Sequence, residues 1–252
     1  MKEQRKIWQG VYQSFSEVEC DQDVFGGSVW IDKVLKKARA LMVATQSNGS
    51  ITKAATTSDY ALPFVAAMAT KRGQTLRILD FGGGLGTSYI PLLSMLGDHE
   101  HLEFVVVENK TLCELGTEFF KADNKIAFCD SIPKTQPFHV VHAGSSLQYV
   151  DDWRGAIREF TDTGAKYLIF ADLPAGDIET FVTAQWFHGR RLPVRFWNLK
   201  EFVSLVEGFC FDLIFKAKYR GYYLKKTSKL PTSHFDARHR LDDCCQLVFR
   251  RK

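Results

Sequence analysis

The sequence predicts an α/β fold in which a doubly wound, mostly parallel β-sheet is covered by helices on both faces. Two observations carry this prediction. From residue 76 to residue 172, short apolar runs typical of buried strands alternate with segments of helical periodicity, as right-handed strand–helix–strand crossovers require. The last two strand-like runs, residues 211–219 and 245–251, are separated by a polar insertion instead of a helix, which predicts one antiparallel strand at an edge of the sheet.

The segment before the sheet predicts an N-terminal cap, in a chain whose 252 residues suit one domain with an added segment. Residues 7–25 carry aromatic side chains at irregular spacing and are interpreted as an aromatic strap. Residues 28–45 have apolar positions at the intervals typical of an amphipathic helix, and the lysines between them are expected to face solvent. A second helix is predicted over residues 59–71, with Ser58 or Asp59 as its N-cap.

Within the sheet domain, periodicity predicts a regular series of elements. Strands are expected at residues 76–81, 102–108, 125–129, 138–143, 166–172, 211–219 and 245–251. Besides a helix directly after the first strand, helices are expected at residues 111–121, 152–161, 178–188 and 199–208.

The turn after the first strand is the most specific feature of the sequence. Asp80 lies near the end of the strand, and glycine fills most of the following positions, namely Gly82, Gly83, Gly84 and Gly86. Glycine is used where the backbone needs a positive φ or where a ligand lies against the main chain. The free N–H groups of the next helix then face that ligand. The turn therefore predicts a nucleotide-cofactor site, and the alternative is a tight connection without a ligand.

The spacing of these glycines separates two cofactor classes. A dinucleotide-binding turn needs Gly-x-Gly-x-x-Gly or Ala, and Thr87 occupies the last of these positions. The pattern Asp-x-Gly-x-Gly-x-Gly is complete from Asp80 to Gly86. This motif resembles the first motif of the class I S-adenosylmethionine-dependent methyltransferases, and the resemblance extends from about Leu76 to Lys252.

Within that superfamily the chain resembles a poorly characterised methyltransferase group that includes members from bacterial surface-polysaccharide gene clusters. The segments that carry this narrower resemblance are Trp8–Phe15, Leu79–Gly86, Ser146–Tyr149 and Gln185. The resemblance implies a Rossmann-like sheet of seven strands in the order 3-2-1-4-5-7-6, preceded by the aromatic strap and helical cap of residues 1–72. Residues 73–252 would then form the S-adenosylmethionine-binding methyltransferase domain.

An acidic residue at the end of the second strand supports a nucleoside ligand. Glu108 stands there, and one carboxylate can accept hydrogen bonds from both ribose hydroxyl groups, although the same residue would also suit NAD. The resemblance implies that Asp80 orients the amino-acid end of the cofactor, whereas His139 departs from the Asp that the family often has. It further implies contacts to adenine and to the methionine moiety from Asp130, Ser131, Gly144 and Ser145.

Methyl transfer is an in-line displacement, so alignment supplies much of the catalysis, and a base matters mainly for a hydroxyl acceptor. Three residues near predicted strand ends are candidates for that base: His188, His142 and Tyr149. His188 is preferred because its sequence context is the most exposed, and Asp172 belongs to the same region. For each histidine the alternative is a structural role.

Composition and charge limit the classes of partner that are expected. The net charge of +4 is mild and the positive residues are dispersed, so nucleic acid is not expected. Without a signal peptide or an apolar run long enough to span a membrane, the chain is expected to be cytoplasmic, and the absence of Cys-x-x-Cys predicts free thiols. No metal site is predicted, because the spacing of His234, His239, Cys244 and Cys245 matches no zinc pattern.

The function implied by the resemblance is methyl transfer from S-adenosylmethionine to a small-molecule or glycan acceptor, with O-methylation of a saccharide preferred. One alternative is an NAD-dependent Rossmann oxidoreductase or epimerase, which Thr87 and the absence of a Tyr-x-x-x-Lys dyad disfavour. The other is a non-catalytic S-adenosylmethionine-binding protein, which would keep Asp80, the glycines and Glu108. The sequence leaves the oligomeric state open.

Overall fold

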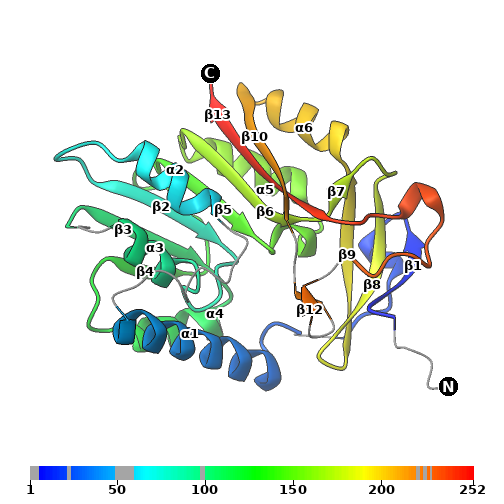
Figure 1. The fold of residues 1–252 in the computed structure, drawn as a ribbon, viewed down its shortest axis with the longest axis horizontal. Coiled ribbons are helices and arrows are strands. Elements are labelled where there is room, and N and C mark those ends of the chain that lie inside the picture. The colour runs from blue at the N-terminus through cyan, green and yellow to red at the C-terminus, as the bar shows by residue number, and fades with distance from the viewer. Residues whose placement is uncertain are drawn as a thin grey trace.

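The computed structural model describes residues 6–21, 24–48, 60–96, 100–219, 222–223, 226–227 and 229–252. Its largest element is a seven-stranded sheet made of β2 (Leu76–Phe81), β3 (Leu102–Val107), β4 (Ile126–Cys129), β5 (Val140–Gly144), β6 (Tyr167–Leu173), β10 (Phe211–Tyr219) and β13 (Cys244–Arg251). Neighbouring strands follow the order β10-β13-β6-β5-β2-β3-β4 (Figure 1). Numbered along the chain within this sheet, the order is the predicted 3-2-1-4-5-7-6. The expected doubly wound, Rossmann-like α/β fold is confirmed.

The antiparallel strand of this sheet differs in place from the prediction. β13 runs antiparallel to both of its neighbours, β6 and β10, so the antiparallel strand lies one position inside the edge and β10 forms the edge itself. The burial of each strand explains this order. Leu247 and Phe249 of β13 are fully buried, as suits a strand with a neighbour on each side. Five of the nine residues of β10 are exposed, as suits an edge strand.

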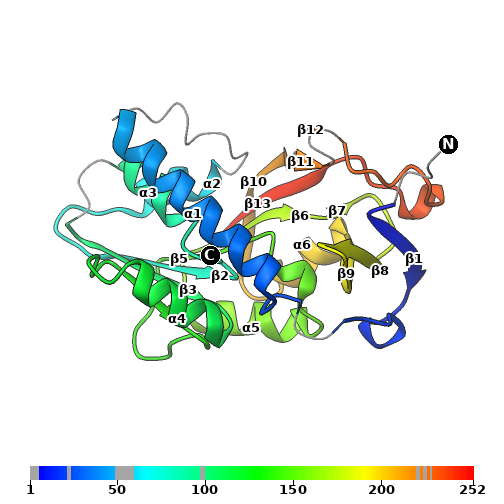
Figure 2. The same ribbon diagram turned by 90° about the horizontal axis from the view of Figure 1, so that it is seen from below.

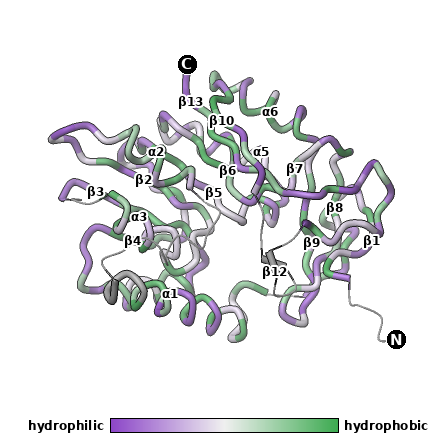
Figure 3. The backbone as a smooth tube through the Cα atoms, viewed as in Figure 1, coloured by the Kyte–Doolittle hydropathy of each residue, from purple (hydrophilic) through white to green (hydrophobic). Residues whose placement is uncertain are grey.

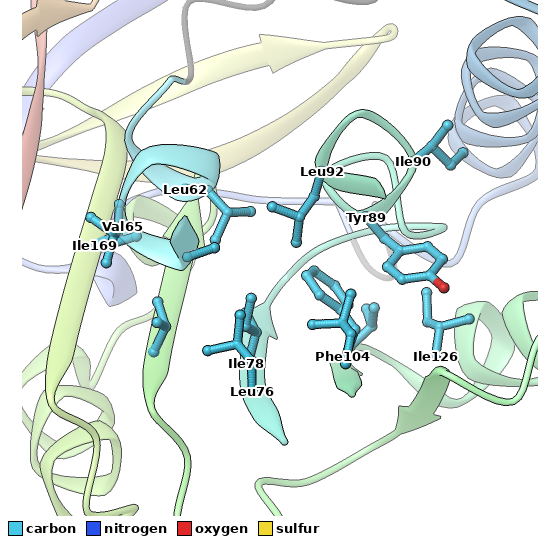
Figure 4. Packing of buried hydrophobic residues seen from close by; sticks show 14 of the residues in the cluster. Leu62, Val65, Leu76, Ile78, Tyr89, Ile90, Leu92, Phe104, Ile126 and Ile169 are labelled. Atoms are coloured by element: carbon cyan, nitrogen blue, oxygen red, sulfur yellow. The ribbon is translucent and has the colours of Figure 1, made fainter. Parts of the chain in front are cut away.

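Helices cover both faces of the sheet. They are α1 (Ser28–Asn48), α2 (Ala61–Ala69), α3 (Tyr89–Leu96), α4 (Lys110–Phe119), α5 (Trp153–Asp162) and α6 (Leu199–Glu207). Figure 4 shows Leu62 of α2 and Leu92 of α3 pointing toward Leu76 and Ile78 of β2, while Val65 of α2 lies beside Ile169 of β6. Residues of α5 and α6 pack instead with Leu79 of β2. Successive side chains of a strand point to opposite faces, so Leu79 faces the other side of the sheet from Ile78. Figure 3 shows hydrophilic residues gathered in loops, such as the one between α2 and β2.

A second, smaller sheet corrects one predicted helix. Its strands, in spatial order, are β1 (Trp8–Tyr12), β8 (Phe181–Phe187), β9 (Arg190–Asn198) and β7 (Ala175–Gly176). The helix expected at residues 178–188 is wrong, because this segment is β8 and turns back into β9 through His188 and Gly189, both with positive φ (53° and 83°). A two-residue turn of that conformation joins twisted antiparallel strands, and glycine adopts it without strain.

The first part of the aromatic strap is a strand of the small sheet. β1 pairs antiparallel with β8, with Trp8 opposite Gln185. The indole of Trp8 is buried and meets Phe196 of β9 edge to face, with ring centroids 5.6 Å apart. Figure 2 shows α1 running from the helical layer of the main sheet toward this small sheet. The N-terminal segment therefore contacts β8 and β9, which lie far from it in the sequence.

The remaining predicted elements agree with the structure to within a few residues. The helix predicted at residues 59–71 corresponds to α2, and its expected caps Ser58 and Asp59 lie outside the described residues. The other short elements are β11 (Tyr222–Tyr223), β12 (Lys226–Thr227) and single turns of 3₁₀ helix at Phe15–Glu17, Leu147–Tyr149 and Ala237–His239. Among the described helices, none combines the length and apolar character that crossing a membrane requires.

Candidate cofactor and acceptor site

The glycine turn joins β2 to α3 and is shaped by contacts that leave no room for side chains. Gly82 has φ +68°, and a Cβ at this position would collide with the Cβ of Ser146. A Cβ on Gly83 would meet the Asp80 carboxylate. Glycine is required at both places, because one needs a left-handed backbone and the other a close approach to a buried acid. The predicted turn geometry is thus present.

A comparison of two glycines tests this packing. Gly73 also has a positive φ, of +72°, but a Cβ there would meet nothing within 4 Å. Both Gly82→Ala and Gly73→Ala introduce backbone strain. We expect Gly82→Ala to lower the free energy of unfolding by about 1–3 kcal/mol more than Gly73→Ala, because only the former overpacks its site. Equal losses in urea unfolding would contradict the tight contact at Gly82.

Asp80 and His142 form a buried pair beneath the turn. Nδ1 of His142 lies 2.7 Å from Oδ1 of Asp80, and each side chain is only 1% exposed. The pair joins the ends of the adjacent parallel strands β2 and β5. Oδ2 of Asp80 is buried and has no hydrogen-bond partner among the described residues. A buried carboxylate oxygen without a hydrogen bond is costly, so a donor placed at this oxygen would be favourable.

Glu108 follows β3 and holds the glycine turn from the other side. Its Oε1 accepts a hydrogen bond from the Gly84 N–H at 3.1 Å, and its Oε2 accepts one from the Asn109 N–H at 3.0 Å. Burial raises the pKa of Glu108 above its ordinary value. Oε2 also accepts a hydrogen bond from Nδ2 of Asn109 at 3.4 Å, so the acceptor capacity left for a ligand is the second lone pair of Oε1.

A cavity of about 470 Å³ lies against the glycine turn, within the usual size range of small-molecule sites. Of the predicted cofactor residues, it brings together Gly82, Gly83, Gly84, Gly144 and Ser145. The others, Asp80, Gly86, Glu108, Asp130 and Ser131, do not line it. Asp130 and Ser131 are exposed, with the Ser131 hydroxyl donating to Oδ1 of Asp130 at 3.3 Å. The nucleoside end of a ligand held by Glu108 would thus lie beside this cavity.

The three candidate bases lie in different surroundings. His142 lines the cavity, but its Nδ1 is engaged with Asp80. The Tyr149 hydroxyl donates to Oε1 of Gln185 at 3.1 Å, and burial raises the pKa of Tyr149 above its ordinary value, so the phenol keeps its proton at neutral pH. His188 is exposed at the β8–β9 turn, and its Nε2 accepts a hydrogen bond from Nζ of Lys33 at 2.9 Å.

Aromatic rings connect the helical cap to the β8–β9 hairpin next to this site. Phe25 lies 5.0 Å from Tyr149 and 5.9 Å from Phe187, measured between ring centroids. Trp30 of α1 lies 5.1 Å from Phe187 and also lines the cavity. Such pairs add stability beyond their buried area. These ring contacts therefore stabilise the packing of the β8–β9 hairpin against the start of α1, beside the cavity.

A second polar pair links two strand ends. The Ser145 hydroxyl donates to Oδ2 of Asp172 at 2.6 Å, and both residues have a positive φ (56° and 51°), which is strained for residues other than glycine. Ser145 lines the large cavity, whereas Asp172 lines a separate cavity of about 60 Å³ together with Tyr149 and Gln185. This pair thus forms part of the wall between the two cavities.

Sequence reasoning missed two residues of the site and left one hydrogen bond open. Lys33 and Lys37, expected to face solvent, line the large cavity. The sequence signal for these two lysines was their spacing from Trp30 and Val34, which places all four side chains on one helix face.

His139 departs from the Asp that the resembled family often has at this position. Its Nδ1 accepts a hydrogen bond from the Arg77 N–H at 3.0 Å, which is a structural role. Among the described residues there is neither a disulfide nor a group of side chains suited to a metal ion.

No protein-family model matches the sequence, and no curated protein matches it. Solved structures do resemble the fold. The Burkholderia thailandensis 1,6-didemethyltoxoflavin-N1-methyltransferase, bound to its acceptor and S-adenosylhomocysteine, matches with a TM-score of 0.50 and 12% identity over 93% of each chain. The glycopeptide N-methyltransferase MtfA with S-adenosylhomocysteine matches with a TM-score of 0.51 and 13% identity, over 75% of this chain and 89% of MtfA.

A third similar structure is the [4+2]-cyclase SpnF, with a TM-score of 0.51 and 15% identity over 75% of this chain and 80% of SpnF. These identities are low, so the likeness concerns the fold. Together with the strand order, it shows that the chain has the fold of the class I S-adenosylmethionine-dependent methyltransferases.

Proposed function

We propose that this protein binds S-adenosylmethionine and transfers its methyl group to a small-molecule or glycan acceptor, with O-methylation of a saccharide preferred. The observation that carries the proposal is the arrangement of Asp80, the glycine turn and Glu108. They follow adjacent parallel strands and lie together beside a cavity of about 470 Å³. Ligands of doubly wound sheets bind at the carboxyl ends of the strands.

The residues present fit this cofactor. Oδ2 of Asp80 is a buried acceptor without a partner among the described residues, which suits the ammonium of an amino acid. Gly82 and Gly83 let a ligand approach the main chain, and Glu108 has acceptor capacity for a ribose. When bound, S-adenosylmethionine supplies an electrophilic methyl group: the acceptor nucleophile forms a bond to it as the carbon–sulfur bond breaks and its electron pair stays on sulfur.

The protein's contribution to this reaction is chiefly alignment. The glycine turn, Gly144, Ser145 and Trp30 line the cavity, and the Trp30 ring packs against Phe187, which also contacts Phe25. Positioning of this kind accounts for a large share of the acceleration of bimolecular reactions. Of the candidate bases, His188 has its Nε2 engaged by Lys33, so a role for it requires Lys33 to move.

Calorimetric titration with S-adenosylhomocysteine and with NAD tests the cofactor. We expect binding of S-adenosylhomocysteine only. Binding of NAD alone would favour the oxidoreductase alternative and contradict the proposal. Transfer of a labelled methyl group is then measured on sugar nucleotides and cell-surface glycans. A second candidate is a non-catalytic S-adenosylmethionine-binding protein, which would bind S-adenosylhomocysteine yet label no acceptor. SpnF, a [4+2]-cyclase, illustrates that this fold is not confined to proteins named as methyltransferases.

The contribution of Glu108 is tested against a matched variant in the strand that precedes it, β3. Glu108→Ala should weaken binding of S-adenosylhomocysteine by about 1–3 kcal/mol, because a partly buried, charged hydrogen-bond acceptor is lost. Glu103→Ala removes the same charge from β3, but Glu103 pairs with Arg77 at 2.8 Å, away from the glycine turn. We expect unchanged affinity for Glu103→Ala. Equal affinity of both variants and the native protein would remove Glu108 from the site.

A further inference from the structure

One face of helix α1 borders the large cavity. Trp30, Lys33, Val34 and Lys37 all line it, at the spacing that puts side chains on the same side of a helix. Lys36 is exposed and does not line the cavity. The lysines of this helix therefore divide into two groups, of which one faces the site and the other faces solvent.

The cavity wall formed by this face is rich in hydrogen-bond donors. The indole Nε1 of Trp30 is buried and has no hydrogen-bond partner among the described residues. Thr87 and Ser88, just before α3, also line the cavity and contribute hydroxyl groups. Among the described residues that line the cavity there is no aspartate or glutamate, since Asp80 lies behind Gly83. Lysine ammonium groups together with hydroxyl and indole donors, in a lining without an aspartate or glutamate, favour an anion.

The hydrogen-bond partner of Lys33 is uncharged. Nζ of Lys33 lies 2.9 Å from Nε2 of His188, and Nζ of Lys37 lies 3.4 Å from the Thr87 hydroxyl. Burial and the charge of Lys33 lower the pKa of His188 below its ordinary value, so this imidazole is uncharged at neutral pH and accepts from the ammonium. His188 thus orients Lys33 at the cavity without neutralising it.

We propose that the α1 face made by Trp30, Lys33 and Lys37 binds an oxyanion, a carboxylate or a phosphate, of a ligand in the large cavity. This inference rests on the proposed function for the identity of the ligand but not for its charge. The oxyanion belongs either to the amino-acid end of the cofactor or to an acidic group on the acceptor. Arginine-like bidentate geometry is absent from this face, so recognition is by charge and by single hydrogen bonds.

The experiment compares Lys33→Gln with Lys36→Gln, which removes the same charge from the solvent side of the same helix. Three probes are titrated into the full chain: S-adenosylhomocysteine, methylthioadenosine, which has the same nucleoside without the amino acid, and inorganic phosphate followed by phosphorus NMR. We expect Lys33→Gln to weaken at least one anionic probe about five- to tenfold, as loss of one charge-assisted hydrogen bond implies. We expect Lys36→Gln and the affinity for methylthioadenosine to change little.

The pattern among the probes identifies the source of the oxyanion. Weaker S-adenosylhomocysteine binding with unchanged methylthioadenosine binding supports the carboxylate of the cofactor. Unchanged S-adenosylhomocysteine binding with weaker phosphate binding supports an acidic acceptor. The proposal is overturned if Lys33→Gln and Lys36→Gln affect all probes equally. Failure of the native protein to bind S-adenosylhomocysteine would count against the proposed function, while the phosphate measurement would still decide the charge of the site.

Discussion

Replacing His142 by leucine should lower the free energy of unfolding by about 3–5 kcal/mol, because it leaves the Asp80 carboxylate buried without its partner. His142 and Asp80 are each 1% exposed, and Nδ1 of His142 lies 2.7 Å from Oδ1 of Asp80. The second oxygen of Asp80 already lacks a partner among the described residues. Removing the histidine therefore strands a whole carboxylate in the interior. Urea unfolding of the purified variant gives the measurement.

Two further variants separate loss of the pair from loss of packing. His142→Asn keeps a donor near the position of Nδ1 and should lose less stability than His142→Leu. The double variant Asp80→Asn with His142→Leu removes the buried charge as well, so its loss should be smaller than the sum of the two single losses. A loss below about 1 kcal/mol for His142→Leu would show that the pair contributes little to folding.

Replacing Trp8 by alanine should also cost about 3–5 kcal/mol, as expected for removal of a large buried aromatic side chain. Trp8 is 5% exposed and packs with Phe196, Phe181 and Leu230 in the core of the small sheet. The control is Val11→Ala in the same strand, since Val11 is 40% exposed and should lose far less. If both variants unfold at the same urea concentration, β1 does not stabilise the small sheet.

The number of unfolding transitions of the Trp8→Ala variant tests how the domain is organised. β1 pairs with β8 across most of the length of the chain, and the Thr183 hydroxyl donates to the backbone oxygen of Gln9 at 3.2 Å. If this pairing stabilises the whole molecule, Trp8→Ala should shift a single cooperative unfolding transition. Two separate transitions would instead indicate that the aromatic strap and helical cap predicted at residues 1–72 unfold independently of the methyltransferase domain.

Strand and helix order could be predicted from the sequence because the signals are local. The apolar run of residues 76–81, the glycines after it and the helical spacing of residues 28–45 each depend on neighbours along the chain. The strand order has a different source, because only the resemblance to a known family implied it. The structure confirms that order and corrects only the place of the antiparallel strand.

The segment of residues 178–188 shows where such local reasoning fails. Its apolar residues fit a helical spacing, but Phe181, Val182 and Thr183 are also good strand formers. What decides between the two is a partner: β8 pairs with β9 on one side and with β1 on the other. The His188–Gly189 turn was a hairpin signal in the sequence, and recognising its positive-φ preference would have corrected the prediction.

The sequence by itself determined the doubly wound sheet, the glycine turn and the acidic residues at the ends of the first two strands, because periodicity and turn chemistry are written in consecutive residues. Only the tertiary structure decided that His142 pairs with Asp80, that Lys33 meets His188 and that the lysines of one α1 face line the cavity. These contacts join residues far apart in the chain, and they depend on how helices and strands pack. Packing direction is a property of the whole fold, which no local pattern contains.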